Sequence, residues 1–134
     1  MERGFLDVKT IREIIRSRGS KKLITVEKQH SVSEAVELMK KYDIEQIPVM
    51  EDDLPVGAIS QQGLFTKIFA DPGLKNSTIQ AVMEKGFPIV PFDSPAEKLT
   101  QYIGKENGAV LTRDEAGSYH IITKYDVIAA LGNP

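Results

Sequence analysis

Hydrophobic and polar positions follow two different periods along this chain. After Ser31, apolar residues recur at i, i+3, i+4 and i+7, a spacing that is typical of a helix with one buried face. These residues are Val32, Ala35, Val36 and Met39. Short runs rich in β-branched residues, such as residues 47–50, predict strands instead. Pro48 indicates that this strand lies at a sheet edge or that it begins there. The chain therefore alternates helices with short strands.

Capping residues set the expected helix starts. The Ser/Thr-x-x-Glu pattern predicts helices that begin at Thr10, Ser31 and Ser94, and residues 77–80 predict another. Helical patterns also follow residues 60 and 123, and the last of these helices runs to about Leu131. We expect strands at residues 23–26, 47–50, 55–60, 87–90, 109–112 and 118–123.

This order of elements occurs twice at one spacing. Ser31 and Ser94 are 94 − 31 = 63 residues apart, and Ser60 and Thr123 are 123 − 60 = 63 residues apart. The common spacing indicates an internal duplication. Each copy alone would bury its sheet poorly, so we expect the copies to pack face to face and leave a cleft for a small ligand. We divide the chain into a linker and leading helix (1–22), a first repeat (23–76) and a second repeat (77–134).

The second strand-to-helix corner carries the best candidate chemistry. Thr123 ends an apolar run and can cap the next helix, while Asp126 falls in the first turn of that helix. A hydroxyl and a carboxylate three residues apart can both face one small polar ligand. The alternative is a capping box without any ligand, because Thr-x-x-Asp is a minor variant of that motif.

Composition limits the classes of function. The 134 residues carry a net charge of −2, and no basic cluster adjoins an aromatic platform, so we expect no nucleic-acid partner. The basic run at residues 16–22 is interpreted as a solvated linker. No stretch approaches the roughly 20 apolar residues of a membrane span, and cysteine is absent, which favours a cytoplasmic location. No phosphate loop, metal-ligand spacing or nucleophile–base pair predicts an enzyme.

With these features in fixed order, residues 10–131 resemble a tandem pair of cystathionine β-synthase (CBS) domains, called a Bateman module. The 63-residue repeat carries the resemblance, together with residues 47–49 before the hairpin and the Ser/Thr-x-x-Asp segment after it. The resemblance implies an α/β (α+β) fold of two pseudo-symmetric β-α-β-β-α repeats, packed through their sheets, with an N-terminal linker helix. It also implies a non-catalytic module that binds S-adenosylmethionine, AMP or ATP and has no intrinsic cofactor or metal.

The resemblance also assigns candidate site residues. In that family the final Ser/Thr and Asp bind the ribose hydroxyls of the ligand, and here Thr123 and Asp126 match them. Ile121 and Tyr125 flank this pair and could line the pocket. We expect Asp126→Ala to abolish binding and to leave the fold intact, since the side chain is needed for ribose and little else.

The first repeat contributes less to the expected site. Across the cleft, the segment that matches the base-contacting strand supplies Ile44, Gln46 and Ile47, with Ser60 nearby. Core packing is the alternative role for Ile44 and Ile47. Gly63 stands where the first repeat should carry its Asp, so we expect that site to be empty or degenerate. In the second repeat His120 replaces a usual glycine, and we expect it to be packed or solvent-facing.

Further segments suggest a parent protein and a partner. Residues 40–49 and 119–126 resemble the C-terminal regulatory part of bacterial cystathionine β-synthase-type enzymes, and Gly4–Asp7 is similar to the linker after their pyridoxal-phosphate catalytic domain. The resemblance implies that the module modulates such a catalytic domain.

We also expect a homodimer, because exposed apolar helices need covering. The helical residues concerned are Leu64, Phe65, Ile68 and Phe69, or Val127, Ile128 and Leu131. The alternative function is a ligand-free module with degenerate sites that only dimerises.

Overall fold

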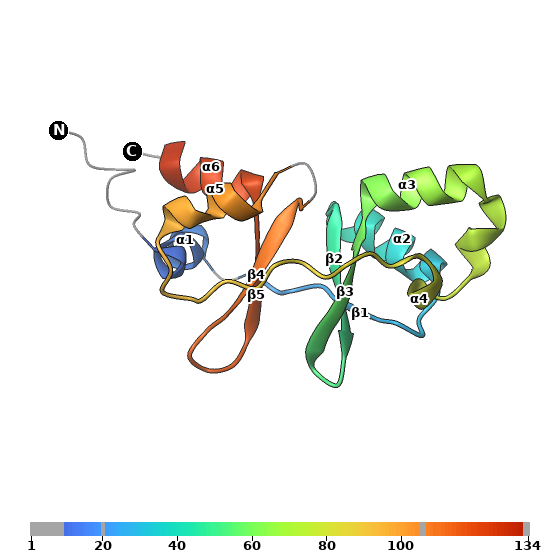
Figure 1. Ribbon diagram of the computed structural model, residues 1–134, viewed down its shortest axis with the longest axis horizontal. Helices are drawn as coiled ribbons and strands as arrows, with labels where there is room; N and C mark the ends of the chain where they lie inside the picture. Colours follow the sequence, from blue (N-terminus) through green and yellow to red (C-terminus); the bar gives the residue numbers. More distant parts are fainter. Residues whose placement is uncertain (1–9, 20, 105–106, 133–134) are drawn as a thin grey trace. The chain divides into compact units, whose positions relative to one another are not determined.

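The computed structural model describes residues 10–19, 21–104 and 107–132, and it has an α/β fold with two small sheets and several helices (Figure 1). Its contacts form two compact units. One unit is Ile24–Phe87, and the other joins the residues up to Leu23 to those from Pro88 onward. The leading helix and the second half of the chain therefore fold together. The predicted linker segment Gly4–Asp7 lies outside the described residues.

The unit Ile24–Phe87 is built on a three-stranded sheet in the order β1-β2-β3. Strand β1 pairs with β2 in parallel, and β2 pairs with β3 in antiparallel orientation. In chain order its elements are β1 (Val26–Glu27), α2 (Val32–Tyr42), β2 (Gln46–Glu51), β3 (Leu54–Ser60), α3 (Gln61–Ala70), a 3₁₀ helix (Pro72–Asn76) and α4 (Ile79–Val82). Their apolar side chains form one core around Val32, Ile47 and Ile59.

Local sequence explains the boundaries of these elements. Ser31 caps α2, and its hydroxyl accepts a hydrogen bond from the Glu34 N–H at 3.1 Å. The β2–β3 hairpin turns at Asp52 and Asp53, which both have positive φ angles, as a two-residue type I′ turn requires. The cap expected within residues 77–80 forms no side-chain bond: Thr78 is the N-cap residue of α4, but backbone carbonyls of residues 28 and 30 accept the first N–H groups of that helix.

Pro48 was expected at a sheet edge or a strand start, and that expectation is wrong. It lies inside β2, the central strand, opposite Ala58. Strand β1 pairs only with Val49 and Met50, so it needs no N–H group from residue 48. On the other side, Ala58 directs both of its backbone hydrogen bonds away from β2, toward Glu84. The proline therefore removes no hydrogen bond from the sheet.

The other unit places helices against the β4–β5 hairpin. Its elements are α1 (Ile11–Arg18), a 3₁₀ helix (Ala96–Lys98), α5 (Leu99–Tyr102), β4 (Ala109–Arg113), β5 (Tyr119–Thr123) and α6 (Lys124–Gly132). Helix α1 begins with the predicted capping box of Thr10 and Glu13 and ends at Gly19, which has a φ of 80°. Ile11, Ile14, Leu99 and Ile122 are buried in the core of this unit.

Two elements expected in this unit are reduced. The predicted strand at residues 87–90 is only a single parallel bridge between Ile89 and Leu111, because Pro88 and Pro91 leave few N–H groups for a ladder. The capping box expected at Ser94 is absent: the 3₁₀ helix beginning at Ala96 has no side-chain cap, and the Ser94 carbonyl accepts the N–H of Ile11 instead.

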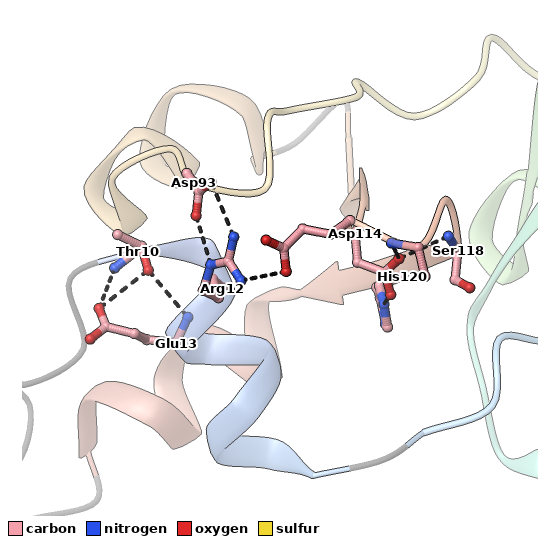
Figure 2. A network of polar contacts seen from close by, with 9 residues as sticks. Thr10, Arg12, Glu13, Asp93, Asp114, Ser118 and His120 are labelled. Atoms are coloured by element: carbon pink, nitrogen blue, oxygen red, sulfur yellow. Dashed lines mark hydrogen bonds and ion pairs between the residues drawn. The ribbon is translucent and has the colours of Figure 1, made fainter.

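A network of charged side chains attaches α1 to the rest of its unit (Figure 2). Arg12 donates to Asp93 at 2.7 Å and to Glu115 at 2.9 Å, and its guanidinium lies over the ring of Phe92. Hydrogen bonds from Arg12 lower the pKa values of both carboxyl groups below their usual range.

In the same region the Phe92 ring also stacks with the imidazole of His120. His120 Nε2 lies 2.8 Å from Asp114 Oδ2, and this hydrogen bond lowers the pKa of Asp114 (Figure 2). His120 is thus half-buried and packed in this unit.

Candidate ligand-binding site

The corner between β5 and α6 holds the hydroxyl–carboxylate pair that the sequence singled out. The Thr123 N–H donates to Asp126 Oδ2 at 2.9 Å, and the Asp126 N–H donates to Thr123 Oγ1 at 3.4 Å. The Thr123 hydroxyl lies 3.2 Å from the same Oδ2 atom. These reciprocal bonds form a capping box, so the pair has a structural role in the helix start.

Helix α1 supplies a third partner, which the sequence analysis missed. Arg18 Nη1 lies 3.0 Å from Asp126 Oδ2 and also donates to the backbone carbonyl of Ile121. The side chains of Arg18 and Asp126 are 11% and 5% exposed, so this is a buried ion pair. The interpretation of residues 16–22 as a solvated linker is therefore wrong for Arg18. No sequence pattern joins these residues, because they are 108 positions apart.

The two oxygens of the Asp126 carboxylate differ in their surroundings. Oδ2 accepts from the Thr123 N–H, the Thr123 hydroxyl and Arg18, whereas Oδ1 has Lys21 Nζ at 3.9 Å. A ligand hydroxyl would therefore bind most readily through Oδ1. The expectation that Asp126 serves ribose and little else is wrong, because removing its carboxylate would leave Arg18 without its buried counter-ion.

The residues flanking the pair differ in exposure. Ile121 is buried, and its backbone carbonyl already accepts from Arg18. Tyr125 lies on α6 with 76% of its surface exposed. The structure thus brings Thr123, Asp126 and Ile121 into one contact group around Arg18, and Tyr125 is a free surface side chain beside it.

The remaining candidates belong to the other unit, Ile24–Phe87. Gln46 pairs with Ser60 across β2 and β3, and both are half-buried. Ile47 is completely buried in the core, while Ile44 packs on the edge of that core. A ligand contact for these four residues stays a prediction, as does their membership of one site with Thr123 and Asp126.

Within the described residues, no group of three or more His, Cys, Asp or Glu side chains is arranged to hold a metal ion. In the same part of the chain, every helix is too short or too polar to cross a lipid bilayer.

Comparison with known proteins identifies the fold. The family model of the CBS domain matches residues 10–70. A CBS-domain-containing protein from Agrobacterium tumefaciens superposes with a TM-score of 0.80 at 17% identity, covering 92% of this chain and 93% of that chain. The fold is that of a CBS-domain pair. A comparison with curated proteins gives no match.

Two further structures share the CBS-pair fold. The CBS domain of a bacterial CNNM/CorC family Mg²⁺ transporter, solved in complex with ATP, has a TM-score of 0.75 at 20% identity and covers 96% of this chain and 92% of that chain. A conserved protein from Pyrococcus horikoshii has a TM-score of 0.72 at 24% identity, with 92% of each chain covered. The descriptions of these three structures do not name a cystathionine β-synthase, so that parent stays a prediction.

Proposed function

We propose that this CBS pair is a non-catalytic regulatory module that binds an adenine nucleotide, with Thr123 and Asp126 holding the ribose. The observation that carries the proposal is the position of the Asp126 carboxylate beside the Thr123 hydroxyl at the β5–α6 corner. One carboxylate can accept hydrogen bonds from both hydroxyls of a ribose, and each bond to an ionised acceptor contributes about 1.5–3 kcal/mol. A neighbour with the same fold was solved with ATP.

The charges beside the carboxylate favour a phosphorylated ligand. Arg18 and Lys21 both approach Asp126, so the local balance is one negative and two positive side chains. A ribose diol on Oδ1 would bring the attached phosphates close to this excess of positive charge. AMP, ADP and ATP should therefore bind more tightly than uncharged adenosine.

S-Adenosylmethionine remains a second candidate ligand because it carries the same ribose diol. It is the ligand expected if the module modulates a pyridoxal-phosphate-dependent cystathionine β-synthase or cysteine synthase-type catalytic domain. Its sulfonium would meet the positive side chains unfavourably, so we rank it below the nucleotides. A calorimetric titration with each ligand compares the affinity for S-adenosylmethionine with the affinities for the nucleotides.

A ligand-free, dimerising module is the alternative function, and one observation favours it. Asp126 Oδ2 already has three hydrogen-bond donors from its own chain, which is the arrangement of a purely structural helix cap and ion pair. The two functions differ in whether any nucleotide raises the melting temperature.

Thermal melting and calorimetry with ATP, ADP, AMP, adenosine, 2′-deoxy-ATP and S-adenosylmethionine test the proposal. A ligand present at 100 times its Kd adds about 2.7 kcal/mol to the free energy of unfolding. We expect a shift with the nucleotides and a loss of about ten- to a hundredfold in affinity when one ribose hydroxyl is missing. No shift with any ligand at millimolar concentration would leave the structural module as the function.

Asp126→Asn is the matched variant, because it keeps the shape of the side chain and removes its charge. We expect it to weaken nucleotide binding about ten- to a hundredfold. Asp53→Asn is the control: it sits in the exposed hairpin turn at a positive φ, which asparagine tolerates. Circular dichroism of both variants separates a loss of binding from a loss of folding.

We also propose that the module forms a homodimer through α3. The rings of Phe65 and Phe69 stack with their centroids 5.9 Å apart, and the two residues are 65% and 80% exposed. They lie beside a groove of about 570 Å³ between α2 and α3. On α6, Ile128 is 68% exposed, while the predicted contribution of the Leu131 side chain lies outside the described residues. Isolated exposed apolar residues are common, but a stacked aromatic pair beside a groove is typical of an interface.

A further inference from the structure

Each repeat has a side-chain hydroxyl that caps the helix after its hairpin, and the two hydroxyls occupy equivalent positions. The 63-residue spacing aligns Ser60 with Thr123 and Gly63 with Asp126. The Ser60 hydroxyl accepts the N–H of Gly63 at 2.9 Å, just as the Thr123 hydroxyl accepts the N–H of Asp126. Only the carboxylate is missing from the first repeat's own helix, which is why the sequence predicted an empty or degenerate site there.

Glu84 places a carboxylate where the side chain of residue 63 would lie. A Cβ atom added to Gly63 would be 2.8 Å from the Glu84 carboxyl carbon and would clash even more closely with Oε2. The Ser60 hydroxyl donates to Glu84 Oε1 at 3.2 Å, which equals the distance from the Thr123 hydroxyl to Asp126 Oδ2. The β3–α3 corner and the β5–α6 corner therefore each present a hydroxyl beside a carboxylate.

The backbone fixes Glu84 in this position. It exchanges two hydrogen bonds with Ala58 on β3, at 2.8 and 3.0 Å, and so forms a bridge on the free edge of that strand. Lys67 Nζ donates to the carbonyl of Val82 and lies 3.8 Å from Glu84 Oε2. The carboxylate is thus held by the fold beside Ser60 and has one cationic neighbour.

We propose that Ser60 and Glu84 form a second site for the vicinal diol of a ribose, with Glu84 replacing the carboxylate that Gly63 lacks. Oε1 accepts from Ser60, which leaves Oε2 to accept from the two ligand hydroxyls. The Glu84 side chain is 41% exposed, whereas Asp126 is 5% exposed, so the Glu84 carboxylate is the more accessible of the two. This inference rests on the proposed function, because it takes the ligand to be an adenine nucleotide.

Calorimetric titration of the full chain with ADP tests the site through its stoichiometry. We expect two binding events for the wild-type chain, loss of one of them in Glu84→Gln, and loss of both in Glu84→Gln/Asp126→Asn. Glu37→Gln is the control, because Glu37 is 74% exposed on α2 and its charge partner is Lys40 at 3.9 Å. The control should keep both events.

A relocation of the carboxylate gives an independent readout. Glu84→Ala should lose the first-repeat event, and Gly63→Asp in the same chain should restore it. The Cβ of the new aspartate then no longer meets the Glu84 carboxylate, and only the Ser60 hydroxyl, which would lie 2.8 Å from that Cβ, has to shift to make room. Gly63→Asp alone should lower the melting temperature, since two carboxylates then compete for one position. Failure of a folded double variant to regain binding would overturn the proposed equivalence of the two positions.

The outcomes separate this inference from the proposed function. An unchanged stoichiometry and affinity in Glu84→Gln, with binding lost in Asp126→Asn, would overturn the second site and keep the first. A gain of a binding event in Glu84→Ala would show that Glu84 blocks the corner, which also overturns the inference. Binding that depends on Glu84 and not on Asp126 would support the inference and overturn the ribose role of Asp126. A wild-type chain that binds no nucleotide would overturn both.

Discussion

Arg18 Nη1 and Asp126 Oδ2 lie 3.0 Å apart, and this ion pair links the end of α1 to the start of α6. Both side chains are almost completely removed from solvent. The carboxylate proposed to hold ribose is therefore also the counter-ion of a buried arginine. Ligand binding at this carboxylate and the attachment of the leading helix are expected to affect each other.

Arg18→Gln should destabilise the protein by about 3 kcal/mol, because removing the closer partner leaves a buried carboxylate with only Lys21, 3.9 Å away, as a counter-charge. Chemical denaturation of the wild type and the variant measures this difference. In Arg18→Gln/Asp126→Asn the second substitution should cost less than it does alone, since neither charge then remains. Additive costs of the two substitutions would contradict a direct interaction.

Acidification should weaken the attachment of α1 through Arg12. Hydrogen bonds from Arg12 lower the pKa values of Asp93 and Glu115 in the folded state, from ordinary values of 3.8 and 4.5. Stability from a lowered carboxyl pKa is present above the ordinary value and is lost as pH falls through the folded-state value. Melting temperature should therefore fall below about pH 5, and part of that fall should depend on Arg12.

Arg12→Gln is the variant that checks this dependence. It should lower the melting temperature at neutral pH and have less effect in acid, as the pH falls below the ordinary carboxyl pKa values and through the lowered folded-state values. The contribution of Asp114, whose pKa is lowered by His120, should remain in both proteins. Parallel curves of melting temperature against pH for the two proteins would contradict the role of Arg12.

Gly57→Ala should destabilise the edge of β3 where Glu84 is attached. An added Cβ would lie 2.7 Å from Met83 Sδ and 3.1 Å from the backbone oxygen of Glu84. We expect a cost of about 1–3 kcal/mol, because the neighbouring segment must move away from the strand. Gly104→Ala is the control, since an added Cβ there meets no atom within 4 Å. Equal stabilities of the two variants, measured by denaturation, would argue against this close approach.

Phe69→Glu should separate the proposed homodimer. Phe69 is 80% exposed and stacks on Phe65, so a carboxylate there would be buried without a partner if two copies met on this face. Sedimentation velocity should show a dimer for the wild type and a dissociation constant raised about thirtyfold or more for the variant. Leu54→Glu, on an exposed hairpin residue, should leave the dimer intact. A monomeric wild type at micromolar concentration would remove the basis of this prediction.

The sequence determined the α/β class, the order of most elements and the CBS-pair fold. Those features follow from local patterns: the capping residues Thr10 and Ser31, the turn at Asp52 and Asp53, and periodic apolar positions. Such patterns act within a few residues, so they can be read without knowing the rest of the chain. The 63-residue spacing extended them into a repeat and located the Thr123–Asp126 corner.

Only the tertiary structure decided which distant side chains reach the two corners. Arg18 comes to Asp126 from 108 positions away, and Glu84 comes to Ser60 from 24 positions away on the other side of a sheet edge. Neither contact has a sequence signature, because each depends on where a packed backbone directs a long side chain. The position of Pro48 in a central strand was also decided by tertiary structure. The strand tolerates a proline there because Ala58, opposite Pro48, makes its backbone hydrogen bonds with Glu84 and not with residue 48.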